Sequence, residues 1–138
     1  MGDLSERIKA ELENIDEVIE EIPAYSRLPH LSSLELAGVA TLLHNFYNGV
    51  ENILKKVLFS HRISIPEGGS WHRDLLERAA MDKIISDGCK DHLLKYLAFR
   101  HFFSHAYALD LQPDKMEPLV ENSRRVYALF RKEKESLL

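Results

Sequence analysis

The longest periodic pattern in the chain runs from Leu34 to Ser60 and limits what the chain can fold into. Apolar residues recur in it at steps of three and four, the spacing that places side chains on one face of an α-helix. They are Leu36, Val39, Ala40, Leu43, Phe46, Tyr47, Val50, Ile53, Leu54, Val57 and Leu58. A helix of this length spans about 40 Å at the standard rise. Covering its apolar face requires several partner helices, so the pattern favours an all-α bundle.

Four further helices are predicted around this segment, which gives a bundle of about five helices. The first follows apolar steps over residues 4–22 and ends at Pro23. A short helix runs from Trp71 to about Met81. The next is predicted to have Asp87 as its N-cap and to carry residues 99–107. The stretch "LQPD" interrupts it, and the last helix runs from about Pro113 to the end.

Residues 24–33, "AYSRLPHLSS", are predicted to form a loop before the long helix. Ser32 or Ser33 offers the N-cap, because Glu35 stands close enough behind to complete a capping box. Gly38 and Gly49 lie inside the long helix, where each costs about 1 kcal/mol relative to alanine. We interpret them as positions where a neighbouring helix approaches closely.

Composition indicates one soluble domain over residues 1–138. The apolar fraction is 45% and the charged fraction 29%, which is typical of a globular chain. We expect no signal peptide and no membrane span, because no stretch reaches the ~18–20 uncharged apolar residues that a span needs. The single Cys89 cannot form an internal disulfide, which favours a cytoplasmic location. Since the net charge is −4, binding of nucleic acid requires a local basic patch.

The segment 99–107, "FRHFFSHAY", places polar side chains in an otherwise apolar run. Burying a charged or unpaired polar group costs several kcal/mol, so these residues need a hydrogen-bonding or ionic partner or a functional role. Arg100 and His105 form the pattern R-x4-H, and Tyr107 extends it to R-x4-H-x-Y. His101 directly follows the arginine.

With this motif in place, the chain resembles the HEPN-domain proteins of the HepT type, the toxins of HEPN/MNT toxin–antitoxin pairs. The resemblance rests on the long second helix, on "GGSWHRDLLERA" before and within the short helix, and on R-x4-H-x-Y late in the chain. It implies a HEPN bundle and a metal-independent endoribonuclease without a cofactor. Arg100 and His105 would be the catalytic pair, and His101 would support the site.

The resemblance also implies regulation and assembly. In HepT-like proteins the tyrosine at the position of Tyr107 is adenylylated by a cognate MNT nucleotidyltransferase, the antitoxin, which silences the nuclease. These proteins are typically homodimers whose motif lies in a cleft at the interface. The rival interpretation, from another class of function, is a non-catalytic helical HEPN module that serves as a binding domain or scaffold.

The residue types suit RNA cleavage without a metal ion. Histidine can take the proton of the ribose 2′-OH or protonate the leaving 5′ oxygen. A guanidinium stabilises the charge that builds on the phosphate oxygens. The products would be a 2′,3′-cyclic phosphate and a 5′-hydroxyl. No cluster of carboxylates accompanies the motif; Asp110 is the nearest one after it.

Each motif residue also has a structural interpretation. Arg100 can pair with a carboxylate such as Glu51 or Asp110, and Tyr107 can be an ordinary core tyrosine. His101 and His105 stand at i and i+4, a spacing that can bind zinc, although no third ligand is evident.

Helix geometry restricts how the catalytic pair can meet. Five residues turn through about 500° on a straight helix, so Arg100 and His105 point about 140° apart. Either the helix distorts between them, or a second chain supplies the missing group at a two-fold axis. We favour the second route.

Basic residues that could track an RNA backbone are found near the end of the long helix and on the last helix. The first group comprises Lys55, Lys56 and Arg62, with His61 between them; the second comprises Arg124, Arg125, Arg131 and Lys132. A solvated face is the ordinary interpretation of either group.

Overall fold

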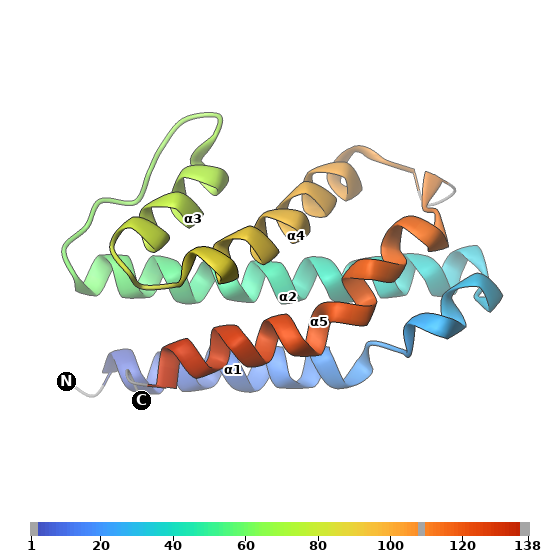
Figure 1. Ribbon diagram of the computed structural model, residues 1–138, viewed down its shortest axis with the longest axis horizontal. Helices are drawn as coiled ribbons and strands as arrows, with labels where there is room; N and C mark the ends of the chain where they lie inside the picture. Colours follow the sequence, from blue (N-terminus) through green and yellow to red (C-terminus); the bar gives the residue numbers. More distant parts are fainter. Residues whose placement is uncertain (1–2, 108–109, 136–138) are drawn as a thin grey trace.

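The computed structural model describes residues 3–107 and 110–135, and within these ranges it contains helices and no strand. Five α-helices and one short 3-10 helix (η1) follow one another along the chain (Figure 1). They are α1 (Asp3–Glu21), η1 (Tyr25–His30), α2 (Ser33–Ser60), α3 (Trp71–Met81), α4 (Asp87–His105) and α5 (Pro113–Lys134). The all-α prediction is confirmed. None of the described helices is long and apolar enough to cross a bilayer.

Helix α2 is the centre of the bundle, because it contacts each of the other four α-helices. Figure 1 shows α1 alongside α2 on one side, with α3 and α4 on the other. Helix α5 contacts α1, α2 and α4, and its N-terminal part also lies against η1. The arrangement follows from the long apolar face of α2, which is buried along its length.

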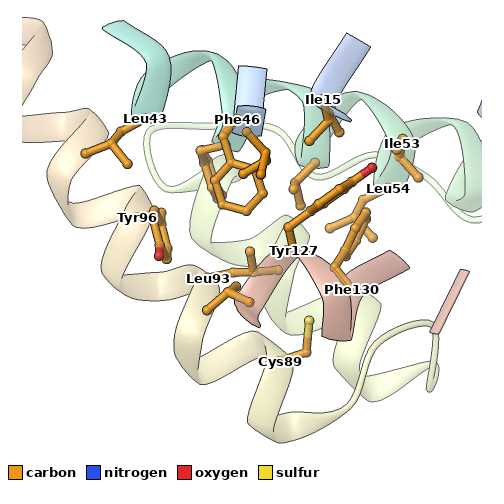
Figure 2. Close-up of a cluster of buried hydrophobic side chains, with 14 of the residues drawn as sticks. Ile15, Leu43, Phe46, Ile53, Leu54, Cys89, Leu93, Tyr96, Tyr127 and Phe130 are labelled. Atoms are coloured by element: carbon orange, nitrogen blue, oxygen red, sulfur yellow. The ribbon is translucent and has the colours of Figure 1, made fainter. Parts of the chain in front are cut away.

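Aromatic side chains from three helices meet in the core (Figure 2). The ring of Phe46 on α2 makes edge-to-face contacts with Tyr96 of α4 and Tyr127 of α5, at centroid distances of 5.2 and 6.1 Å. Both tyrosine hydroxyls have acceptors. Tyr96 donates to the Leu119 carbonyl at 2.7 Å, and the Tyr127 hydroxyl lies 2.5 Å from Oδ1 of Asp16 and 3.1 Å from the Leu12 carbonyl. These bonds allow two polar rings to pack in an apolar centre.

The N-cap prediction is confirmed for α2 and is wrong for α4. At α2 the capping box forms on Ser32: its hydroxyl accepts from the Glu35 N–H at 3.1 Å, and the Glu35 carboxylate accepts from the Ser32 N–H at 2.9 Å. At α4 the prediction of Asp87 as N-cap is wrong. The N-cap is Ser86, whose hydroxyl accepts from the Cys89 N–H at 3.1 Å, and Asp87 is the first helical residue. There its negative charge still favours the helix N-terminus.

The prediction of a plain loop over 24–33 is also wrong, because Tyr25–His30 forms a 3-10 helix. Leu28 in its middle is fully buried, and the segment lies against α5. One buried side chain in six residues is too short a pattern to show a helical period in the sequence. Pro29 is tolerated because the turn is short and 3-10 in character.

Of the two glycines in α2, one is a close-packing position. A Cβ atom on Gly49 would lie 2.6 Å from Cγ1 and 2.8 Å from Cδ1 of Ile15 on α1, whereas a Cβ on Gly38 would meet nothing within 4 Å. Gly49 therefore allows α1 to approach α2, and the interpretation as a packing glycine holds for Gly49 and not for Gly38.

We expect alanine to have opposite effects at the two glycines. Gly38→Ala should raise the free energy of unfolding by about 0.5–1 kcal/mol, because Gly38 is an exposed helical residue. Gly49→Ala should lower it, because overpacking against Ile15 costs about 1–3 kcal/mol and outweighs the gain in helix propensity. Urea unfolding of both variants measures the difference. Equal stabilisation by the two changes would show that α1 and α2 have room for a methyl group at Gly49.

Candidate active site

The R-x4-H segment lies at the C-terminal end of α4, which ends at His105. Ala106 has extended backbone angles (φ −92°, ψ 152°), so Tyr107 follows the helix instead of extending it as the sequence pattern predicted. Every residue from Arg100 to His105 is α-helical, and the Ser104 hydroxyl donates to the Arg100 carbonyl at 2.8 Å within that turn. The helix between the two motif residues is therefore regular, and their side chains leave it in different directions.

Arg100 is partly buried and faces α2. Its Nε donates to Oδ1 of Asn48 at 3.1 Å, and Nδ2 of Asn48 lies 2.9 Å from Nε2 of His44. Over the described residues no carboxylate lies within ion-pair distance of Arg100. The two carboxylates considered from the sequence are engaged elsewhere: Glu51 with His72, and Asp110 with a backbone N–H. A pairing of Arg100 with either one is not what the structure contains.

His44 completes this group from the preceding turn of α2. Desolvation by burial is the main cause that lowers the pKa of His44, and the positive charge of Arg100 lowers it further. Phe103 of α4 packs against its ring at a centroid distance of 5.8 Å. The neutral form of His44 is thus favoured beside the guanidinium of Arg100.

His101 and His105 lie on the exposed side of α4, with ring centroids 5.0 Å apart. A shallow open pocket of about 430 Å³ lies beside them. Its lining residues are Ala98, His101, Phe102, His105, Ala106 and Asp110. Arg100 is not among them. One protomer therefore places the two histidines together and leaves the arginine on a different face of the same helix.

Tyr107 is 82% exposed, so the interpretation as a core tyrosine is wrong. A reciprocal turn holds its backbone: the Tyr107 N–H donates to Oδ2 of Asp110, and the Asp110 N–H donates to the Tyr107 carbonyl, both at 2.9 Å. The phenol is consequently presented to solvent two residues after His105. That is a position which a modifying enzyme can reach.

A second polar group on α2 lies one turn further along the helix. Glu51 is 3% exposed, and its Oε2 is 2.8 Å from Nδ1 of His72 on α3. Burial, with the charge of Glu51 as the next cause, raises the pKa of Tyr47 far above its ordinary value. The roles of His44, Asn48 and Glu51 were not predicted from the sequence. The signal that could have found them is their i, i+4 and i+7 spacing along one edge of the apolar face of α2.

The basic residues predicted to bind RNA lie at the C-terminal end of α2 and just after it. Lys55 Nζ is 4.5 Å from the ring centroid of Trp71, Lys56 forms a 3.5 Å ion pair with Glu11, and Arg62 is exposed. Figure 1 shows this end of α2 and the C-terminal end of α4 well apart. The structure does not bring the basic group to the motif, and its role in RNA binding stays a prediction.

No three histidine, cysteine or acidic side chains within residues 3–107 and 110–135 are grouped so that they could hold a metal ion. Cys89, the single thiol of the chain, is buried, and burial raises its pKa to about 12, so it stays protonated. A protonated thiol is a poor metal ligand and a poor nucleophile. The zinc interpretation of His101 and His105 thus lacks a third ligand among the described residues.

An all-helical bundle with an R-x4-H segment at the end of one helix defines the class of HEPN-domain proteins. Comparison with known families agrees: residues 38–137 match the family described as HepT-like protein. The match spans α2 to α5 and the whole motif, which is most of the chain, so the protein belongs to the HepT-like family. Its fold is the helical HEPN bundle of that family, and the family places it in the context of toxin–antitoxin systems. Neither the curated proteins nor the solved structures gave a match.

Proposed function

We propose that the protein is an endoribonuclease toxin that cleaves cellular RNA through Arg100 and His105 without a metal ion. The observation that carries the proposal is the state of Arg100: its guanidinium is held by a neutral amide, while exposed imidazoles lie on the same helix. An arginine without a carboxylate partner keeps its full charge available for a phosphodiester. Membership of the HepT-like family supports the same activity.

The proposed reaction is an internal transfer of the phosphodiester. A histidine acting as base removes the proton from the ribose 2′-OH, and the 2′ oxygen attacks the adjacent phosphorus. The bond from phosphorus to the 5′ oxygen breaks, and that oxygen is protonated as it leaves. The products are a 2′,3′-cyclic phosphate and a 5′-hydroxyl. Arg100 stabilises the negative charge on the phosphate oxygens, and His101 supports His105 from the preceding turn.

We further propose that each site is shared between two copies of the chain. Because α4 is regular between Arg100 and His105, one phosphate has no easy access to both side chains of the same protomer. A two-fold axis beside α4 would pair Arg100 of one protomer with His105 of its partner. The exposed Phe102, in the pocket beside the histidines, is apolar surface that such an interface would cover.

Regulation is proposed to act on Tyr107. An MNT-type nucleotidyltransferase antitoxin would transfer AMP to its hydroxyl, which is exposed and close in sequence to His105. The adduct adds bulk and a negative charge at the edge of the site, and both oppose the approach of an RNA phosphate.

Purified protein should cleave RNA in excess EDTA and leave 2′,3′-cyclic ends, which end-specific ligation and sequencing detect. Arg100→Ala and His105→Ala should each reduce the rate by about 10²-fold or more, as for other charge-stabilising and acid–base groups. Matched controls are Arg73→Ala and His30→Ala, since both residues are exposed and lie outside the motif. Activity that disappears with EDTA and returns with magnesium would contradict the metal-independent route. Growth arrest that persists equally in Arg100→Ala would favour the non-catalytic module.

Mixing Arg100→Ala chains with His105→Ala chains tests the shared site. Each mixed dimer would contain one intact site and one that lacks both groups, so activity should return to about half of the wild-type value per dimer. Native mass spectrometry verifies that mixed dimers form. If they form and remain as inactive as the parents, both groups act within one protomer.

Tyr107→Phe should remain toxic and should escape silencing by the antitoxin enzyme, because phenylalanine lacks the hydroxyl that accepts AMP. Intact-mass measurement after incubation with antitoxin and ATP should show added AMP on the wild type and none on the variant. Tyr25→Phe, at another exposed tyrosine, is the control and should still be modified. Equal modification of Tyr107→Phe and wild type would place the acceptor elsewhere.

A further inference from the structure

We propose that Asn48 is a positioning residue for Arg100 and that His44 fixes the orientation of Asn48. The inference rests on the proposed function for its catalytic meaning, and on the hydrogen bonds between α2 and α4 for its geometry. Neither residue belongs to the R-x4-H segment. Both come from α2, the most central helix of the bundle.

The direction of each hydrogen bond follows from the chemistry of the groups. Arginine has donors and no acceptor, so the atom of Asn48 that faces Nε of Arg100 at 3.1 Å must be the oxygen Oδ1. The amide nitrogen Nδ2 then faces His44 and donates to its Nε2 at 2.9 Å. Since Nε2 accepts, the proton of the neutral imidazole is on Nδ1, which is buried and has no hydrogen-bond partner among the described residues. The chain of donors thus runs one way, from Arg100 through Asn48 to His44.

This arrangement uses the Nε–H donor of the guanidinium and leaves the Nη1 and Nη2 donors without a protein partner among the described residues. The bond to Asn48 occupies Nε–H, and no hydrogen bond from Nη1 or Nη2 to another described residue is present. Those two nitrogens can present parallel N–H groups to a phosphate. Anchoring through Nε therefore orients the guanidinium and leaves Nη1 and Nη2 accessible to a phosphate.

The neutrality of the anchor matters as much as its position. A carboxylate at the position of Asn48 would hold Nε equally well, but its charge would offset the charge that the phosphate requires. The amide restrains the guanidinium and leaves its charge intact. His44 in its neutral form adds no second positive charge to the cluster, and Phe103 packs on its ring from α4. The cluster is therefore built to hold an arginine that remains fully charged.

Two substitutions at Asn48 separate anchoring from charge. Asn48→Ala removes the anchor, and we expect kcat on an RNA oligonucleotide to fall about 10- to 100-fold, with a smaller change in KM, because a misplaced catalytic group acts mainly in the transition state. Asn48→Asp retains an acceptor for Nε but adds a negative charge, and we expect a loss of similar size. Asn45→Ala, an exposed asparagine on the same helix, should match wild type. Equal kcat for Asn48→Ala and Asn45→Ala would overturn the proposal.

A double-mutant cycle tests whether Asn48 acts through Arg100. In an Arg100→Ala background, Asn48→Ala should cause little further loss, whereas independent roles would multiply their losses. Full multiplication would overturn the positioning role. Thermal unfolding of each variant, with Asn48→Asp as the near-isosteric change, shows that the readout comes from folded protein.

A spectroscopic readout keeps this inference separate from the proposed function. The Nε–H group of Arg100 should give a slowly exchanging ¹H–¹⁵N signal in the wild type and in Asn48→Asp. The signal should be lost to exchange with water in Asn48→Ala. If the wild type has no ribonuclease activity, the proposed function fails, while the loss of this signal still supports the anchor. Persistence of the signal in Asn48→Ala overturns the anchor whatever the activity.

Discussion

The structure depends on burying one continuous apolar face, that of α2. Thirteen of its residues are buried, and four α-helices are needed to cover them. Because α2 is the common neighbour, its residues set the distances between helices that do not follow one another in sequence. Gly49 shows this at short range, since the absence of a side chain there sets how closely α1 approaches. A substitution on α2 is consequently expected to alter the packing of several other helices.

The same helix carries polar groups along one edge of its apolar face. Asn48 bonds to Arg100 of α4 and to His44 on its own helix, and Glu51 bonds to His72 of α3. Hydrogen bonding stabilises a buried polar group, so Asn48 and Glu51 each specify a partner on another helix, while His44 bonds to Asn48 within α2. Apolar packing brings the helices together, and these pairs fix how α3 and α4 are set on α2. The arginine of the motif is thereby attached to the most central helix of the fold.

Much of this fold could be predicted from the sequence where a local rule decides the outcome. The apolar period of α2, the capping box of Ser32 with Glu35 and the short helix Trp71–Met81 are all set by neighbours within a few residues. Prediction was weaker where the outcome depends on long-range contacts. The 3-10 helix at Tyr25–His30 forms where buried Leu28 meets the rest of the bundle, and Gly49 differs from Gly38 only through Ile15.

In the candidate site, too, local features could be predicted from the sequence and long-range contacts could not. The motif residues were identifiable by spacing, but the neutral anchor at Asn48 was not, because it lies 52 positions before Arg100. A carboxylate such as Glu51 or Asp110 was the structural alternative that the sequence offered for this arginine. The choice of an amide is visible only when α2 and α4 are placed side by side. A neutral amide holds the guanidinium without offsetting its charge.

The end of α4 at His105 divides the motif into two parts with different freedom. Arg100 is partly buried and tied to α2, whereas His105 is exposed and Tyr107 lies beyond the helix with its phenol in solvent. Arg100, held by α2, provides a positive charge and no group suited to proton transfer. The exposed end of α4 provides the imidazoles of His101 and His105 and no arginine. The arginine and the two histidines thus face different ways on one helix. Under the proposed function, the half that binds phosphate is preorganised in the folded monomer, and the acid–base half is brought to it by association. Under the same proposal, association would control activity before any modification of Tyr107.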